Sequence, residues 1–279
     1  MSFTGAAIVA GVAGWPIKHS RSPRIHNYWL HQYGIDGIYV PLAIPPERAK
    51  DAFRMLPAMG IRGLNVTVPH KEEAYKAMVE VDRWAQRMKA VNTVTVRDGI
   101  LYGANTDAFG FLESLREARP GWRADAGPAV ILGAGGAARA IVAGLQDTGA
   151  PEIRIANRTP DRSAAIRDEF GKPVRPVLWD HRADVLEDAA LLVNTTSLGM
   201  EGQPALDIDL SKLPVDAVVY DIVYVPLETP LLAAARARGN PAVDGLGMLL
   251  HQARPGFREW FGADPVVDQA LRDHVLAVL

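Results

Sequence analysis

One segment, residues 129–159, constrains the fold of this chain more than any other. A short apolar run, Ala129–Leu132, predicts a buried strand, and the glycine-rich turn Gly133–Ala138 follows it directly. A helical stretch then runs to Leu145, and Ile153–Ala156 predicts a second strand. Strand, G-x-G-x-x-A, helix and strand in this order indicate a dinucleotide site, because free N–H groups at the helix start face a pyrophosphate. We therefore expect a doubly wound, parallel α/β domain of Rossmann type.

The end of the second predicted strand indicates which dinucleotide binds. An NAD-binding unit places an acidic residue there, about 20 residues after the glycines, on the ribose 2′-hydroxyl. This chain instead has Asn157, Arg158 and Thr159, with Arg162 shortly after. A carboxylate would repel a 2′-phosphate, whereas a guanidinium offers it a matched fork of donors. The pattern favours NADP(H); the alternative is that both arginines are solvated surface charges, one of them paired with Asp161.

Composition limits the class of protein. A chain of 279 residues fits two domains or one large one. With 30 basic and 32 acidic residues, it has no excess of positive charge of the kind that binds nucleic acid. No cysteine is present, which excludes disulfides, thiolate metal sites and cysteine nucleophiles and agrees with a reducing cytoplasm. No stretch approaches the roughly 20 apolar residues of a membrane span. We expect a cytoplasmic protein with no membrane partner and no bound metal, and a homodimer is compatible with the sequence.

The remaining patterns alternate between strand and helix. Strands are predicted at 7–12, 38–44, 63–68, 191–194 and 217–221, and a hairpin with an Asp-Gly turn at 91–104. Helices are predicted at 22–33, 46–59, from Pro69 onward, at 109–118, 245–254 and 266–279. Such alternation predicts a parallel-rich α/β domain in the first hundred residues as well.

Two hydroxyl side chains precede the first predicted helix. Ser22 stands before Pro23 and a helical run, which is typical of an N-cap with proline at the first turn. Capping alone would explain Ser22, but it does not explain Ser20. Two hydroxyls at a helix N-terminus would also make a cradle for a substrate carboxylate.

A second polar cluster contains a lysine in an unfavourable place. Asn65 and Thr67 would point to the same face of a strand, and Lys71 follows at a helix start, where the dipole favours anions. Such a local conflict suggests function, although a solvated surface lysine is the alternative. Asp107 either caps the following helix or partners Lys71, tuning an ammonium that exchanges protons with a substrate oxygen.

Nine motifs occur in order along the chain. They are G-W-P-I-K-H-S-R-S-P-x-I-H-N, N-V-T-V-P-x-K, A-V-N-T, G-A-N-T-D, G-A-G-G-A-A, N-R-T, N-T-T-S-L-G-M, D-I-V-Y-x-P-L-E-T-P-L-L and G-x-G-M-L-x-x-Q. In these motifs the sequence strongly resembles the NADP-dependent shikimate dehydrogenase family, from about Val9 to Gly262. The resemblance implies reversible reduction of 3-dehydroshikimate to shikimate with NADPH, in aromatic amino-acid biosynthesis on the way to chorismate. It also implies a catalytic domain at 1–107, an NADP-binding Rossmann domain at 108–244, and tail helices at 245–279 that return to the catalytic domain.

The resemblance further implies residue roles. Lys71 would be the acid/base group, with Asp107 beside it. The substrate-binding residues would be Ser20, Ser22, Asn65, Thr67, Asn92, Tyr224 and Gln252, with Asp107 also near the ring hydroxyls. The cofactor-binding residues would be Gly133, Ala134, Gly135, Gly136, Ala137, Asn157, Arg158, Thr159, Arg162, Thr195, Ser197, Met200, Gly245 and Met248.

The sequence also admits other roles and other functions. His70, beside Lys71, stands where relatives often carry an aromatic residue, and a direct role and a purely structural one are both considered. A quinate/shikimate dehydrogenase of broader specificity is the closest alternative. A non-catalytic NADP-binding regulatory relative and a dehydrogenase for another small hydroxy acid are further ones.

Overall fold

The computed structural model describes residues 3–277 and divides the chain into two compact units. Unit 1 comprises residues 1–107 together with 250–279, and unit 2 comprises residues 108–249. Unit 1 is therefore discontinuous in sequence. The contact boundary in the tail follows Leu249, inside a helix, rather than the predicted position at residue 245.

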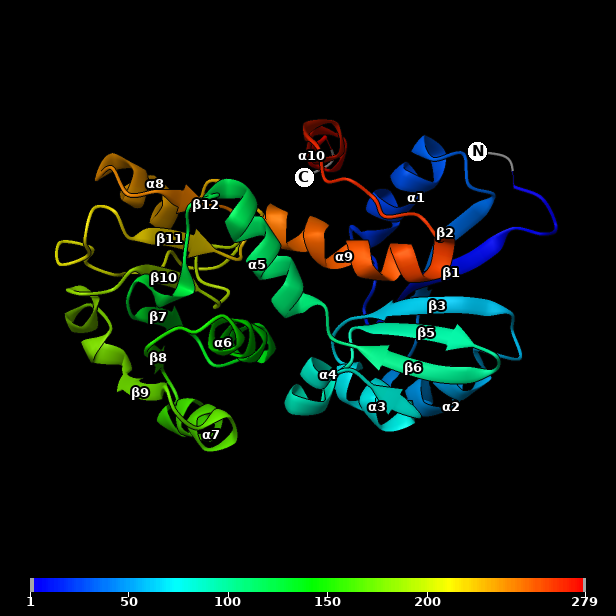
Figure 1. Cartoon of the computed structure of the whole chain (residues 1–279), viewed down its shortest axis with the longest axis horizontal. Coiled ribbons are helices and arrows are strands. Elements are labelled where there is room, and N and C mark those ends of the chain that lie inside the picture. The colour runs from blue at the N-terminus through cyan, green and yellow to red at the C-terminus, as the bar shows by residue number, and fades with distance from the viewer. Residues whose placement is uncertain (1–2, 278–279) are drawn as a thin grey trace. The chain divides into compact units, whose positions relative to one another are not determined.

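Unit 1 is built on a six-stranded mixed sheet with the strand order β2-β1-β3-β5-β6-β4 (Figure 1). Its strands are β1 Ile8–Gly14, β2 Gly37–Ala43, β3 Ile61–Val66, β4 Glu80–Val81, β5 Thr93–Arg97 and β6 Ile100–Ala104. Strand β1 pairs in parallel with β2 and β3, whereas β3, β5 and β6 pair antiparallel. The predicted hairpin is confirmed, and its turn residues Asp98 and Gly99 have the positive φ values that such a turn requires.

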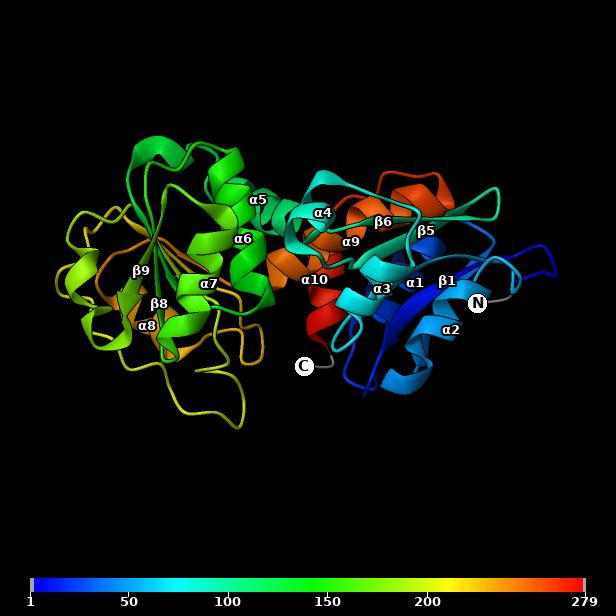
Figure 2. The same ribbon diagram turned by 90° about the horizontal axis from the view of Figure 1, so that it is seen from below.

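Helices cover both faces of this sheet. Helices α2 Ala49–Met55, α3 Lys71–Ala77 and α4 Arg83–Met88 lie on the face that Figure 2 shows in front. Helix α1 Ser22–Gln32, the end of α9 Leu246–Phe261, and α10 Gln269–Leu276 lie on the other face (Figures 1 and 2). The predicted helix at 46–59 was too long, since a 3₁₀ turn, η1 Pro46–Arg48, opens it and α2 ends at Met55.

The face under α1 and α9 is packed with aromatic rings. His26 stacks on Tyr39 with ring centroids 4.0 Å apart, and Trp29 meets Phe257 edge to face. The Trp260 indole donates to the Val94 carbonyl at 3.0 Å. A Cβ at Gly63 would stand 2.0 Å from the indole nitrogen, so only glycine leaves room for this ring against the strand.

Unit 2 carries the predicted doubly wound sheet, which is wholly parallel. Its order is β12-β11-β10-β7-β8-β9, visible from top to bottom in Figure 1. The strands are β7 Ala129–Leu132, β8 Ile153–Asn157, β9 Val174–Leu178, β10 Leu191–Asn194, β11 Val218–Asp221 and β12 Ala242–Val243. This is the Rossmann arrangement. The chain runs outward from β7 through β8 to β9 on one side of the sheet, and from β10 through β11 to β12 on the other, so the direction reverses between β7 and β10. The helices are α5 Asp107–Ala118, α6 Gly136–Asp147, α7 Pro160–Phe170 and α8 Pro230–Ala237, and the 3₁₀ turns are η2 Ala124–Ala126, η3 Trp179–His181 and η4 Asp184–Leu186.

Both tail helices differ from their predicted bounds. Helix α9 continues to Phe261 although Pro255 and Gly256 lie inside it, where the sequence pattern ends a helix near Arg254. Burial of Phe257 and Trp260, both at most 2% exposed, outweighs these breaker residues. The last helix is shorter than predicted, running from Gln269 to Leu276, and residues 278–279 lie outside the described residues.

Candidate active site

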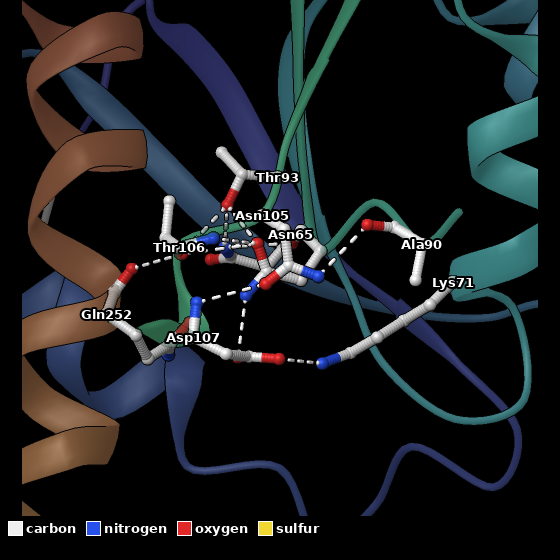
Figure 3. A network of polar contacts seen from close by, with 9 residues as sticks. Asn65, Lys71, Ala90, Thr93, Asn105, Thr106, Asp107 and Gln252 are labelled. Carbon is white, nitrogen blue, oxygen red and sulfur yellow. Dashed lines mark hydrogen bonds and ion pairs between the residues drawn. The ribbon is translucent and has the colours of Figure 1, made fainter. Parts of the chain in front are cut away.

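The Lys71 ammonium and the Asp107 carboxylate meet in unit 1. Lys71 is the first residue of α3, and its Nζ donates to Asp107 Oδ2 at 2.5 Å (Figure 3). The side chains are 30% and 14% exposed, so the pair is reachable from solvent without being fully solvated. The unfavourable position of Lys71 at a helix N-terminus is compensated by this contact.

Two neighbouring asparagines fix the Asp107 side of the pair. Asn92 Nδ2 donates to Asp107 Oδ1 at 2.7 Å, so both carboxylate oxygens accept a hydrogen bond. Asn105 Oδ1 accepts the Asp107 N–H at 3.1 Å, and Asn105 Nδ2 donates to the Ala90 carbonyl at 2.9 Å. Asp107 is the first residue of α5, and the acceptor for its own N–H is Asn105. The alternative that Asp107 serves only as an N-cap is therefore wrong.

Buried polar side chains lie around the Lys71–Asp107 pair. Asn92 is 2% exposed, and its Oδ1 accepts from the Thr106 N–H at 2.9 Å. Thr106 Oγ1 in turn donates to the Gln252 carbonyl at 2.8 Å, which joins the middle of α9 to these polar groups (Figure 3). The structure thus brings the Gln252 backbone to Thr106, the residue that precedes Asp107, across a long stretch of sequence.

Asn65 is oriented by a residue that the sequence patterns did not single out. The Tyr39 hydroxyl donates to Asn65 Oδ1 at 2.7 Å, and Asn65 Nδ2 donates to the Asn92 carbonyl at 3.3 Å. Burial raises the pKa of Tyr39 well above its usual value, so the phenol stays protonated and keeps donating. Burial also lowers the pKa of the stacked His26 to about 3, against a smaller opposing effect of the Asn65 amide. Tyr39 gave no signal beyond its place in a strand.

The two serines differ from the sequence expectation. Helix α1 begins at Ser22, and no side chain caps its N-terminus. Ser20 Oγ accepts the Ser22 N–H at 3.3 Å, so the local acceptor is Ser20, and the prediction of Ser22 as N-cap is wrong. The physical reason is that Arg21 already has helical backbone angles, which moves the helix start. Ser22 is buried and Ser20 is half-buried.

Thr67 and His70 lie in the connection between β3 and α3. Strand β3 ends at Val66, so Thr67 is not in the strand, although its N–H still donates to the Ala13 carbonyl at 2.9 Å. His70 is 1% exposed, and its Nε2 lies 2.7 Å from the Ile44 carbonyl oxygen. This contact makes His70 an anchor between two loops.

The glycine-rich turn of unit 2 has the geometry of a phosphate site. Gly133 has a φ of +105°, and a Cβ there would lie 2.6 Å from Thr195 Oγ1. At Gly135 and Gly136 a Cβ would meet nothing within 4 Å, which leaves the start of α6 open to an approaching ligand. Open N–H groups at the start of a 12-residue helix suit an anion. Ala134 and Ala137 belong to the same turn.

The arginines after β8 are available for a ligand. Arg158 and Arg162 are exposed, and within residues 3–277 neither forms an ion pair with Asp161 or any other acid. Asn157 Nδ2 donates to the Thr159 carbonyl at 2.8 Å, which shapes the turn that carries Arg158. These groups could hold a phosphate ester at the end of β8.

The other predicted cofactor residues also lie in unit 2. Thr195, Ser197 and Met200 follow β10, and Gly245 and Met248 lie before and at the start of α9. A Cβ at Gly245 would stand 2.1 Å from the Ile222 carbonyl oxygen, so this close approach requires glycine. Tyr224, predicted for the substrate, is half-buried in unit 2 after β11.

A Rossmann unit and a unit with a lysine–aspartate pair, joined in one chain, define the class of two-unit α/β dehydrogenases. Family models narrow this class: residues 12–94 match the shikimate dehydrogenase substrate binding domain, and residues 121–200 match shikimate / quinate 5-dehydrogenase. The chain belongs to the shikimate dehydrogenase family.

Individual members of this family are similar to the chain over nearly its whole length. The chain is 58% identical over 275 residues to the NADP(+) shikimate dehydrogenase of Paramagnetospirillum magneticum, covering 98% of this chain and 100% of that one. It is similar to the Thermus thermophilus shikimate 5-dehydrogenase in complex with NADP(H) and shikimate, with 37% identity, a TM-score of 0.86, and 98% and 100% coverage. It is also similar to the quinate dehydrogenase of Corynebacterium glutamicum in complex with NAD, with 32% identity, a TM-score of 0.89, and 97% and 99% coverage.

No helix among residues 3–277 is both long and apolar enough to cross a membrane.

Proposed function

We propose that this chain is an NADP-dependent shikimate dehydrogenase, which reversibly reduces 3-dehydroshikimate to shikimate with NADPH. The observation that carries the proposal is the 2.5 Å contact between Lys71 and Asp107, set among buried amides in a unit separate from the nucleotide-binding turn. Family membership and the names of the relatives support both substrate and cofactor.

In the proposed mechanism, bound NADPH supplies the hydride for the carbonyl carbon of the substrate. Lys71 gives a proton from its ammonium to the carbonyl oxygen as negative charge develops there, and takes it back in the reverse direction. Asp107 holds the ammonium in place through Oδ2, while Asn92 holds the carboxylate through Oδ1. This leaves Lys71 with donors to spare, because an ammonium has three N–H groups.

The remaining predicted residues complete the proposal. Hydroxyl, amide and carboxylate groups would bind the substrate carboxylate and ring hydroxyls: Ser20, Ser22, Asn65, Thr67, Asn92, Asp107, Tyr224 and Gln252. The turn 133–137 would hold the pyrophosphate and 157–162 the 2′-phosphate. Thr195, Ser197, Met200, Gly245 and Met248 would lie near the ribose and nicotinamide.

A steady-state comparison of substrates and cofactors tests this function. We expect the purified protein to oxidise shikimate with NADP⁺ at least tenfold more efficiently, by kcat/KM, than quinate with NADP⁺ or shikimate with NAD⁺. Equal use of NAD⁺ would contradict the role of Arg158. Efficient turnover of quinate would favour the alternative of a quinate/shikimate dehydrogenase of broader specificity. No turnover with intact nucleotide binding would favour a regulatory protein.

The proposal includes a compartment and an assembly. A sequence without cysteine agrees with the reducing cytoplasm as the compartment. A homodimer is the assembly to test, by sedimentation equilibrium of the purified protein.

A further inference from the structure

Unit 2 contains a buried carboxylate that the mechanism above does not use. Asp221 is the last residue of β11 and is 0% exposed. Its Oδ1 accepts from Asn194 Nδ2 and from the Val223 N–H, both at 3.0 Å, and its Oδ2 accepts from Thr229 Oγ1 at 2.7 Å. All three donors are neutral, and no basic side chain in the described part of the chain pairs with Asp221. Burial outweighs these hydrogen bonds and raises the pKa of Asp221.

Asn194, at the end of β10, is the main link from this carboxylate to the next loop. Its Oδ1 accepts from both the N–H and the hydroxyl of Thr196, at 3.0 and 2.7 Å, and its Nδ2 donates to the Leu198 carbonyl at 3.1 Å. A backbone N–H can only donate and a carbonyl can only accept, so these two groups fix the orientation of the amide. It is therefore an N–H of Asn194 that faces Asp221. The 0% exposed amide has every polar group engaged.

The loop held by Asn194 lies against the phosphate turn. Thr196 Oγ1 accepts the Leu198 N–H at 3.1 Å, which closes the loop around the amide. The neighbouring Thr195 donates through both its N–H and its hydroxyl to the Leu132 carbonyl, at 2.8 and 2.7 Å. Leu132 directly precedes Gly133. The loop after β10 is therefore hydrogen-bonded to the residue from which the glycine turn after β7 begins.

The loop after β10 lies at the point of the sheet where a dinucleotide is expected to bind. Strands β7 and β10 are neighbours in the sheet, and the strand order reverses between them. In doubly wound sheets a dinucleotide binds in the crevice at the carboxyl ends of the strands at that point. Whatever fixes the loop after β10 therefore fixes one wall of the cofactor crevice.

We propose that Asn194 and Asp221 form a buried positioning pair for the NADP(H) site, with Asn194 holding the loop 195–200 and Asp221 holding Asn194. This rests on the proposed function only in assuming that unit 2 binds NADP(H). Neither side chain touches the cofactor in this account. The hydrogen-bond pattern does the positioning, and the negative charge of Asp221 is not required.

Thr229 provides a matched control within the same cluster. It donates to the other oxygen of Asp221 and caps α8, where its Oγ1 accepts the Leu232 N–H at 3.3 Å. No hydrogen bond of Thr229 reaches the loop after β10 within the described residues. Removing its hydroxyl should therefore destabilise unit 2 while leaving the cofactor wall in place.

The experiment compares full-length variants by direct NADPH binding, measured by nicotinamide fluorescence without shikimate, together with thermal unfolding. We expect Asn194→Ala to raise the Kd for NADPH at least tenfold. Thr229→Val should lower Tm about as much as Asn194→Ala does, but it should leave the Kd for NADPH within twofold of the wild-type value. Asp221→Asn should leave Kd within threefold, because its Oδ1 can still accept from Asn194 and Val223 while its amide donates to Thr229.

Three results would overturn the positioning role. They are an unchanged Kd in Asn194→Ala, an equal rise in Thr229→Val, or a wild type that binds no NADPH. If Asn194→Ala is unfolded by circular dichroism, Thr196→Val carries the test, since it removes one donor to Asn194 and the acceptor for Leu198. A threefold or larger rise in Kd supports the role, and an unchanged Kd in folded Thr196→Val contradicts it. NADPH binding without oxidation of shikimate would contradict the proposed function and leave the positioning pair standing.

Discussion

Two aspartates, one in each unit, show how differently the same side chain is used. Asp107 is partly exposed, takes an ammonium on one oxygen and an amide on the other, and lies at a helix start. Asp221 is fully buried at a strand end and accepts only from neutral groups. A carboxylate with a cation and access to solvent can take part in proton exchange, whereas a buried one with neutral donors supports the loops around it.

The same contrast applies to the amides beside them. Asn92 supports a charged pair that is partly open to solvent, and Asn194 supports a loop through backbone contacts. Changes at the exposed pair should therefore act on turnover, and changes at buried groups should act on stability or cofactor affinity.

Removing the ammonium should have the largest effect. We expect Lys71→Ala to lower kcat by about 10³-fold with little change in the KM for shikimate, because proton transfer acts in the transition state. Steady-state kinetics measure both constants. Lys76→Ala is the control, since Lys76 lies on the same helix in an exposed pair with Glu73 and should keep full activity. A large rise in KM at unchanged kcat would make Lys71 a binding residue.

Neutralising its partner should have a smaller effect. Asp107→Asn keeps an oxygen for the Asn92 amide but loses the charge that holds Lys71, and kcat should fall about 10- to 100-fold. Activity assays with saturating shikimate and NADP⁺ measure this change. A loss as large as that of Lys71→Ala would assign proton transfer itself to Asp107.

Buried His26 should make stability depend on pH. Its pKa of about 3 lies below the usual 6.5, so the unfolded chain binds the proton first and wild-type stability is lost as pH falls below 6.5. Within residues 3–277 neither ring nitrogen of His26 has a hydrogen-bond partner, so His26→Phe should be tolerated in the aromatic cluster. Urea unfolding should show the variant gaining about 1.4 kcal/mol on the wild type between pH 7.5 and 5.5. A constant difference across this range would show that folding does not lower the pKa of His26.

Of these variants, Asp221→Asn should show the smallest effect. Its stability relative to the wild type should change with pH in the direction opposite to that of His26→Phe. The raised pKa means that the folded chain holds its proton at a pH where the unfolded chain has lost it. Wild-type stability from this group is present below pH 3.8 and is lost as pH rises through the folded pKa. The variant lacks this loss, so its Tm relative to the wild type should rise from pH 3.5 to pH 7, as thermal unfolding at the two pH values measures. A falling difference would contradict the burial effect.

The sequence patterns predicted local features well where chemistry and periodicity agree. The strand, glycine turn and helix at 129–147 follow from residues adjacent in the chain, as does the Asp98-Gly99 hairpin turn. The patterns missed helix α7, whose surface is mostly polar, and strand β9, whose burial is irregular. Helix α9 was cut short because Pro255 is a strong local signal, while the packing of Trp260 depends on a distant strand.

The candidate site shows the same limit. Lys71 and Asp107 were each recognisable, but only the fold brings them to 2.5 Å. Tyr39 could not be found, because its role depends on a hydroxyl that reaches Asn65 across the sheet. Asn194 and Asp221 belong to recognised motifs, yet their contacts with each other and with Thr229 are set by tertiary structure.

The discontinuity of unit 1 has a consequence for synthesis on the ribosome. Trp29 donates to the Val266 carbonyl and Trp260 to the Val94 carbonyl, so the first and last parts of the chain complete one core. All of unit 2 emerges before Leu250, whereas unit 1 waits for about its last 30 residues. The second unit can therefore fold first, and the aromatic face of the first sheet stays uncovered until the segment from Leu250 to Val266 has been made.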